Sequence, residues 1–305
     1  MKIHLKCLEC ILHSFFNLLN EFNVDENVQK QMTRKFLVYL STVDFELSPP
    51  EIGRYTHNMI KKILNTKDPY FDLKKIHNKQ ILDKYDFFYK KINHTDNPVK
   101  SALTLSIAGN IIDMSPNHNL SMEETIKNAL KQNLKIDDSD ILIKDLKQGK
   151  SVLYLADNAG EIVFDKLLLQ ILLEKKIIKK EQIIVAVRGY PTINDATIED
   201  AKDIGLINMV KVIDNGDDAP GTILETTSNE FKNIFDKSEL IIAKGQGNFE
   251  CLNLVKNKNI YFMFIVKCKL IGDEIGTSIG DLICKKTVTI HLNKKCNNYN
   301  VSGLT

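Results

Sequence analysis

The strongest constraint on the fold is a change in hydrophobic periodicity after Gly149. Beyond it, segments of helical periodicity separate short apolar runs at 152–156, 183–187, 210–213, 240–243, 260–266 and 288–292. Runs that are apolar throughout are typical of parallel strands buried on both faces, with helices crossing between them. The pattern predicts an α/β fold with a doubly wound, mostly parallel sheet in a Rossmann-like three-layer arrangement.

The part of the chain before about residue 135 has helical periodicity instead. Apolar residues recur at spacings of three and four within 8–22, 31–40 and 51–64. Ser48 is a favourable N-cap for the third of these helices, because Glu51 follows three residues later. Asp68-Pro69 predicts a break, and further helices are expected from Pro98 to Ile112 and over 121–132.

Glycine is unevenly distributed, since only Gly53 and Gly109 of the 14 glycines lie before residue 149. The later ones cluster after the predicted strands, where the backbone must turn tightly or approach a ligand. We expect 1–135 to be a helical region covering the active site, 136–292 an α/β domain that binds metal and phosphate, and 293–305 a tail. Together these parts are expected to form one functional unit.

Charge and hydropathy argue against several classes of partner. The chain of 305 residues has 41 Lys and Arg against 39 Asp and Glu, and no basic stripe interleaved with aromatic residues. Nucleic-acid binding is therefore disfavoured. The longest apolar run, 260–266, is far shorter than the roughly 20 residues that span a bilayer. With no secretory cleavage signal after the first residues, we expect a cytoplasmic protein without a membrane or nucleic-acid partner.

Polar segments follow four of the predicted strands. They are Asp157-Asn158-Ala159-Gly160-Glu161; Arg188-Gly189-Tyr190-Pro191 with Asn194-Asp195; Asp214-Asn215-Gly216-Asp217-Asp218; and Lys244-Gly245-Gln246-Gly247-Asn248. Because open α/β sheets bind ligands beyond the carboxyl ends of their strands, these segments are expected to meet at one site.

The side chains in these segments suggest a metal site. Asp157, Asn158 and Asp195 supply oxygen ligands without imidazole or thiolate, a set that suits Mg²⁺ or Mn²⁺. The alternative is that Asp157-Asn158 only forms a turn and a helix N-cap, which both residue types favour.

Other side chains in the same segments suggest anion binding. Arg188 and Lys244 supply positive charge, and Gly245 and Gly247 would let backbone N–H groups approach a phosphate. The sequence lacks a P-loop motif, and Glu250 stands where a dinucleotide-binding fingerprint would need its third glycine.

These motifs resemble the damage-control phosphatase family, also known as domain of unknown function 89. The resemblance rests on the motifs at 157–161 with Asp165, at 188–201 from Arg188-Gly189 to Asp200-Ala201, at 219–221 (Ala219-Pro220-Gly221) and at 244–250, and on Asp68-Pro69-Tyr70, Ala108-Gly109-Asn110-Ile111-Ile112-Asp113 and Cys7-x-x-Cys10. The Cys7-x-x-Cys10 pair is similar to that of the compact prokaryotic-type subfamily. Taken alone, the pair indicates either two reduced thiols or half of a metal or redox site.

The resemblance implies a metal-dependent phosphatase acting on small phosphometabolites such as phosphosugars or nucleotides. It implies that Asp157, Asn158 and Asp195 hold a divalent cation, which could be Mg, Mn, Co or Ni, and that Lys244 and Arg188 contact the phosphate. Further candidate phosphate or substrate contacts are Gly245, Gly247, Asn248, Asn110, Asp113 and Asp218.

Two other functions are compatible with these residues. A relative in the family has been proposed to methylate carboxyl groups with S-adenosylmethionine, and a doubly wound sheet permits that chemistry. The segment after the first strand is, however, Asp157-Asn158 rather than the glycine loop expected for that cofactor. The third possibility is a protein that binds phosphorylated metabolites without turnover. The sequence does not indicate the natural substrate or the oligomeric state.

Overall fold

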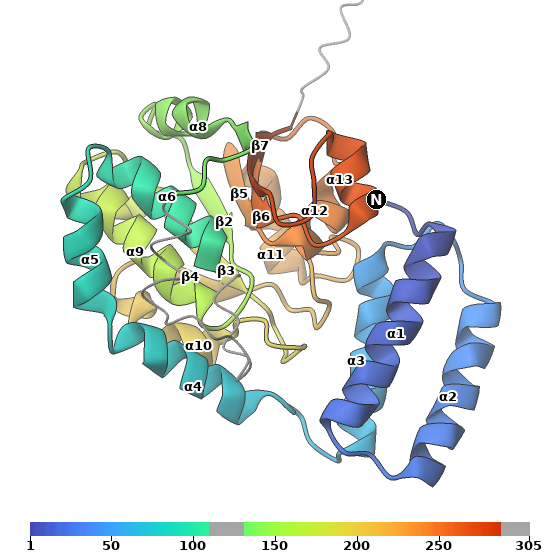
Figure 1. The fold of residues 1–305 in the computed structure, drawn as a ribbon. Helices are drawn as coiled ribbons and strands as arrows, with labels where there is room; N and C mark the ends of the chain where they lie inside the picture. Colours follow the sequence, from blue (N-terminus) through green and yellow to red (C-terminus); the bar gives the residue numbers. More distant parts are fainter. Residues whose placement is uncertain (110–130, 288–305) are drawn as a thin grey trace, which may run out of the picture.

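A computed structural model of the chain describes residues 1–109 and 131–287. Its centre is a seven-stranded sheet in the order β1-β7-β6-β5-β2-β3-β4 (Figure 1). The strands are β1 Ile136–Asp137, β2 Val152–Leu155, β3 Ile183–Val187, β4 Lys211–Asp214, β5 Leu240–Lys244, β6 Ile260–Ile265 and β7 Leu282–Lys286. The strands from β2 to β6 pair in parallel, and β7 pairs antiparallel to β6. The prediction of a mostly parallel α/β sheet is confirmed.

Two strands at one edge of the sheet were not predicted. β7 is short and ends in two lysines, and β1 has two residues, so neither gives the long apolar run that marks a buried strand. β1 pairs parallel to β7. The antiparallel edge extends a sheet whose parallel part is sandwiched between helices.

Helices cover both faces of the sheet, which makes three layers. They are α4 Phe71–Leu82, α5 Tyr85–Asn93, α6 Pro98–Ala108, α8 Ser139–Leu146, α9 Glu161–Glu174, α10 Ile198–Asp203, α11 Asn229–Lys237, α12 Gln246–Leu252 and α13 Lys269–Ile275. One apolar cluster joins α5, α6 and α9 to Tyr154 and Ile242. A second cluster joins α11, α12 and α13 to Leu153 and Ile241 on the opposite face. The side chains of neighbouring residues in a strand thus pack into the cores on opposite faces of the sheet.

The first three helices pack around an apolar cluster of their own. They are α1 Leu5–Glu21, α2 Glu26–Ser41 and α3 Pro49–Ile63, and Phe15, Phe36 and Ile52 are completely buried between them. The predicted start of α3 is confirmed, because Ser48 N–H donates to the Glu51 carboxylate at 2.6 Å in a capping box. Figure 1 shows α1–α3 as a group beside the sheet, with α4 leading from it to α5 and α6.

Several sequence predictions lie outside the described residues. These are the strand at 288–292, nearly all of the helix at 121–132, the end of the helix beyond Gly109, and the tail at 293–305. The division into a helical region, an α/β domain and a tail stays a prediction. In the described part of the chain, no helix has both the length and the apolar character to cross a membrane.

Candidate functional site

The candidate site lies where the winding of the sheet reverses direction. β2 is hydrogen-bonded to β3 on one side and to β5 on the other, so the connections after β2 and β5 leave in opposite directions. Asp157 and Asn158 follow β2, and Lys244 is the last residue of β5. Open α/β sheets bind ligands in the crevice at this point.

The segments after β2 and β3 are joined by backbone hydrogen bonds. Ala196 N–H donates to the Asp157 carbonyl at 2.7 Å, and Ala159 N–H donates to the Asn194 carbonyl at 2.8 Å. Asn158 and Asp195 form an isolated antiparallel bridge. The three residues predicted to hold the cation are therefore brought together, although they are 38 residues apart in sequence (195 − 157).

Arg188, at the carboxyl end of β3, links the two aspartates. Its Nε donates to Asp195 Oδ2 at 2.6 Å, and its Nη2 lies 3.8 Å from Asp157 Oδ1. Only 2% of the residue is exposed, and Nη2 has no hydrogen-bond partner among the described residues. Arg188 thus has one guanidinium nitrogen available beside the two carboxylates.

The site contains more buried negative charge than Arg188 offsets. Burial raises the pKa of Asp157 well above its usual range, and the nearby Asp195 and Glu161 carboxylates raise it further. Burial also raises the pKa of Asp195, despite the opposing effect of the Arg188 guanidinium. A bound cation would favour the ionised form of both aspartates.

Lys244 lies on the inner side of the site and is completely buried. Its ammonium donates to Glu161 Oε1 at 2.7 Å, Asp165 Oδ1 at 2.5 Å and the Ser106 carbonyl at 3.0 Å. An ammonium has three N–H bonds, so each already has an acceptor. The predicted contact between Lys244 and a phosphate stays untested, and it would require the loss of one of these bonds.

Gly245, the N-cap of α12, and Gly247 in its first turn are packed directly against the other strand ends. A Cβ atom at Gly245 would lie 2.1 Å from Asp157 Oδ2, and one at Gly247 would lie 2.1 Å from the Pro220 carbonyl oxygen. Contacts within the protein therefore already require glycine at both positions, and the predicted approach of a phosphate to their N–H groups stays a prediction. At Gly245 the contact is with a predicted metal ligand.

Asn248 is buried behind Arg188. Its Nδ2 donates to the Lys244 carbonyl at 2.7 Å, and its Oδ1 accepts from Thr222 at 2.8 Å and from Arg188 Nη1 at 3.5 Å. Thr222 also accepts from Arg188 at 3.3 Å and was not identified from the sequence. These contacts hold the guanidinium in place, and they occupy the polar atoms of the Asn248 side chain.

Asp218 lies in the loop after β4 and is held by α3. Its Oδ2 accepts from Asn58 at 3.0 Å and from Lys61 at 3.4 Å. Lys61 also donates to the Pro191 carbonyl at 2.9 Å, so α3 contacts the loops after both β3 and β4. A direct substrate contact by Asp218 stays a prediction.

The remaining predicted residues are placed as follows. Asn110 and Asp113 lie outside the described residues. Cys7 and Cys10 are free thiols on α1, the first buried and the second exposed. Across 1–109 and 131–287, no group of three or more His, Cys, Asp and Glu side chains is arranged to hold a metal ion. The predicted ligand set contains only two carboxylates plus an amide and is not such a group.

The sequence analysis assigned no role to Glu161 and Asp165, which lie one turn apart on α9. Both are buried, and both accept from Lys244. Asp165 Oδ1 also accepts from Ser106 and Tyr154, each at 2.7 Å. The spacing of four residues on a helix that follows the predicted metal-binding turn is a signal that could have identified the pair.

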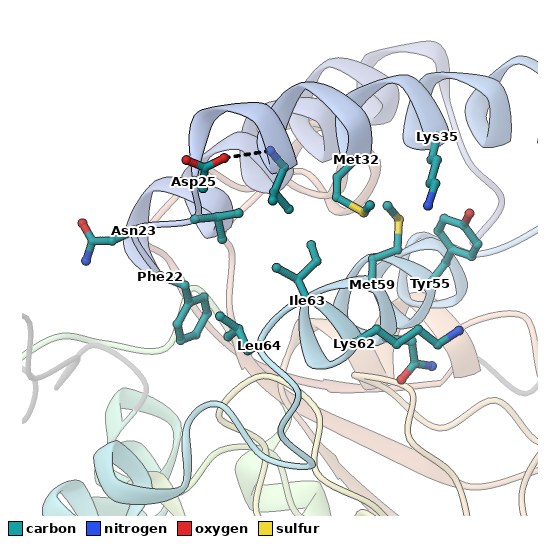
Figure 2. A pocket seen from close by; sticks show the side chains of 13 residues that line it. Phe22, Asn23, Asp25, Met32, Lys35, Tyr55, Met59, Lys62, Ile63 and Leu64 are labelled. Carbon is teal, nitrogen blue, oxygen red and sulfur yellow. Dashed lines mark hydrogen bonds between the residues drawn. The ribbon is translucent and has the colours of Figure 1, made fainter.

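A separate cavity of about 610 Å³ lies between α2 and α3, and the turn between α1 and α2 closes one side of it. Figure 2 shows that its side chains are mostly apolar, with Met32, Met59, Ile63 and Leu64 around the hollow and Lys35 and Lys62 near its edge. None of the predicted site residues lines this cavity. The polar, charged strand ends are the better candidate for catalysis, because chemistry requires convergent ionisable groups.

Comparisons with known proteins place the chain in a family. The model of the damage-control phosphatase ARMT1-like domain matches residues 3–283. The chain is similar to protein MJ0202 of Methanocaldococcus jannaschii, 37% identical over 299 residues that cover 94% of this chain and 96% of that protein. It is also similar to the damage-control phosphatase PH1575 of Pyrococcus horikoshii, 32% identical over 288 residues that cover 94% and 98% of the two chains.

The solved structures agree with this result. A crystal structure of a DUF89 family protein from Pyrococcus horikoshii matches with a TM-score of 0.84 at 30% identity, covering 94% of this chain and 99% of that one. The resemblance seen in the sequence motifs is thereby confirmed over nearly the whole chain. On the family model, the relatives and the fold together, this chain belongs to the damage-control phosphatase ARMT1-like domain family.

Proposed function

We propose that this protein is a divalent-cation-dependent phosphatase that hydrolyses small phosphorylated metabolites. The observation that carries the proposal is the convergence of Asp157, Asn158 and Asp195 at the reversal point of the sheet, beside the free Nη2 of Arg188. Two relatives named damage-control phosphatases, from Pyrococcus horikoshii and Archaeoglobus fulgidus, support this class of reaction.

The donor set fits a hard divalent cation. The buried Asp157 and Asp195 offer carboxylate oxygens and Asn158 an amide oxygen in a region of excess negative charge, which suits Mg²⁺ or Mn²⁺ and also permits Co²⁺ or Ni²⁺. When bound there, the cation would polarise a phosphoryl oxygen and acidify a water molecule. The identity of the cation is part of the proposal.

Arg188 is the residue best placed to neutralise phosphate charge. It is fixed by Asp195, Thr222 and Asn248, and its Nη2 is left to donate to an equatorial phosphoryl oxygen. Neutralising these oxygens is a main task in phosphoryl transfer. A guanidinium held by three groups loses little conformational entropy when the substrate binds.

One of the two buried aspartates would accept the proton of the attacking water. The loops after β3 and β4 would form the walls of the substrate-binding site. Lys61 and Asn58 of α3 hold these loops in place. A cytoplasmic location and the absence of nucleic-acid and membrane partners stay predictions.

The proposal is tested by phosphate release from phosphosugars, nucleotides and other small phosphate esters, with each of the four cations. We expect activity that needs added cation and falls at least ~100-fold in Asp157→Ala. Activity unaffected by a chelator or by this substitution would overturn the proposal. Methyl transfer from S-adenosylmethionine without metal, or metabolite binding without turnover, would favour one of the two alternative functions.

A further inference from the structure

We propose that Lys244 and Glu161 are positioning residues that set the orientation of the Asn158 amide, so that its oxygen faces the cation. The inference rests on the proposed function, because it assigns Asn158 Oδ1 as a metal ligand. It gives Lys244 a role different from the phosphate contact expected from the sequence.

The orientation of the Asn158 amide is fixed by two acidic neighbours. Its Nδ2 donates to Asp157 Oδ2 at 2.8 Å and to Glu161 Oε2 at 3.2 Å. Both N–H bonds of the amide are thereby used, and Oδ1 remains as the atom that can coordinate a cation. A rotation of the amide by 180° would bring Oδ1 against two carboxylate oxygens, a repulsive arrangement.

Glu161 connects this amide to Lys244. Its two carboxylate oxygens have different partners, since Oε1 accepts from Lys244 at 2.7 Å and Oε2 accepts from Asn158. Only 3% of Glu161 is exposed, so the positive charge of Lys244 is needed to keep a carboxylate there. The order of contacts is Lys244, Glu161, Asn158 and then the cation.

The direction of the Lys244 side chain follows from the alternation of β5. Leu240 and Ile242 belong to the apolar cluster with α6 and α9, and Ile241 and Ala243 belong to the cluster on the other face. Alternate residues of a strand point to the same face, so the side chain of residue 244, like those of 240 and 242, extends toward α6 and α9. There it meets Glu161 and Asp165 rather than the open side of the crevice.

The buried network has a second branch that provides a matched control. Asp165 Oδ1 accepts from Lys244, Ser106 and Tyr154, whereas the Asn158 amide donates to Asp157 and Glu161. Tyr154→Phe removes one donor to Asp165 and leaves the contacts of Glu161 unchanged. This variant disturbs the same buried cluster without touching the branch that leads to the cation.

The test measures the affinity of purified protein for Mn²⁺, by electron paramagnetic resonance or calorimetry, together with thermal stability. In Glu161→Gln, one of the two carboxylate oxygen positions becomes an NH₂ group, so either Lys244 or Asn158 faces a donor in place of its acceptor. We expect Mn²⁺ affinity to fall ~10–100-fold, the range found when partners of metal ligands are removed. Tyr154→Phe should lower the melting temperature and leave Mn²⁺ affinity within about twofold of the wild type.

A third variant separates failure of this inference from failure of the proposed function. Asp157→Ala removes a direct ligand, and it should abolish Mn²⁺ binding if the site is the proposed one. Loss of binding in Asp157→Ala with wild-type affinity in Glu161→Gln would overturn the inference and leave the function intact. Wild-type affinity in Asp157→Ala would overturn the function itself.

A double variant covers the case in which Glu161→Gln does not fold. Glu161→Gln combined with Lys244→Gln removes one negative and one positive charge, so the net charge of the buried cluster is unchanged. We expect the same loss of Mn²⁺ affinity, because neither glutamine restores the ionised partner of Asn158. Wild-type affinity in the folded double variant would also overturn the inference.

Discussion

The contact between Gly245 and Asp157 shows how closely the residues of the site are fitted. Gly245 has φ 79° and ψ 155°, a backbone conformation that is essentially restricted to glycine. The missing side chain leaves room for the Asp157 carboxylate. A glycine that the sequence analysis expects near a phosphate thus makes space for the side chain of a proposed metal ligand.

Gly245→Ala is expected to destabilise the protein by at least ~2 kcal/mol and to abolish Mn²⁺ binding, because the methyl group would displace Asp157. Gly276→Ala is the control, since Gly276 also has positive φ but no atom within 4 Å of the added methyl. Gly276→Ala should lower the free energy of unfolding by about 1 kcal/mol and leave Mn²⁺ binding unchanged. Urea unfolding and Mn²⁺ titration measure both effects, and equal losses in the two variants would contradict this explanation.

Single residues also show the limits of prediction from sequence. The grouping of Asp157, Asn158 and Asp195 followed from strand ends that meet at one edge of a parallel sheet. The partners of Lys244 could not be predicted in the same way. They come from α6 and α9, and which helix residues face a strand depends on packing. The alternation along β5 could have indicated its direction but not its partners.

Among the elements, α3 has two faces with different tasks. One face packs Ile52 and Ile60 into the core of α1–α3. The other presents Arg54, Asn58 and Lys61, at helical spacing, to the loops after β3 and β4. Residues spaced by three and four lie on one side of a helix, so this arrangement ties the first helices to the walls of the site.

Arg54→Met is expected to destabilise the protein by about 2 kcal/mol, because it leaves the buried Asp217 carboxylate without the cation 2.9 Å away. Lys30→Met removes a bridge of 2.7 Å between exposed groups on α2 and should cost at most ~0.5 kcal/mol. Chemical unfolding of the two variants gives the comparison. A loss in Lys30→Met as large as that in Arg54→Met would show that burial does not decide the effect.

His57 on α3 predicts a pH dependence of stability. Burial, assisted by Lys61, lowers its pKa from 6.5 to about 4. Between these values only the unfolded chain takes up the proton, so stability is complete above pH 6.5 and falls as the pH falls toward 4. The linked loss approaches about 3 kcal/mol at the lower limit.

His57→Gln removes this titration. Its free energy of unfolding should therefore fall less than that of the wild type when the pH is lowered from 7.5 to 4.5, as measured by urea unfolding at both values. Any pH dependence shared by the two proteins comes from other groups and cancels in the comparison. An identical decrease in both would show that His57 is not buried as a neutral side chain.

For the whole molecule, the periodicity after Gly149 was enough to predict the parallel core of the sheet, because buried parallel strands are apolar throughout. It did not predict β7, whose antiparallel position at the edge allows a strand with lysines at its end. The strand order places β2 next to β5 and so brings segments about 90 residues apart, at 157 and 244, into contact. That long-range pairing creates the site.

The most direct test of the central claim measures Mn²⁺ binding and phosphate release on the same samples of wild type and Asp195→Asn. This change keeps the shape of a proposed ligand, which Arg188 contacts at 2.6 Å, but removes its charge. We predict one Mn²⁺ per wild-type chain, and a parallel loss of binding and activity of at least ~10-fold in the variant. Full phosphate release by the variant, or by wild type stripped of metal, would contradict the account.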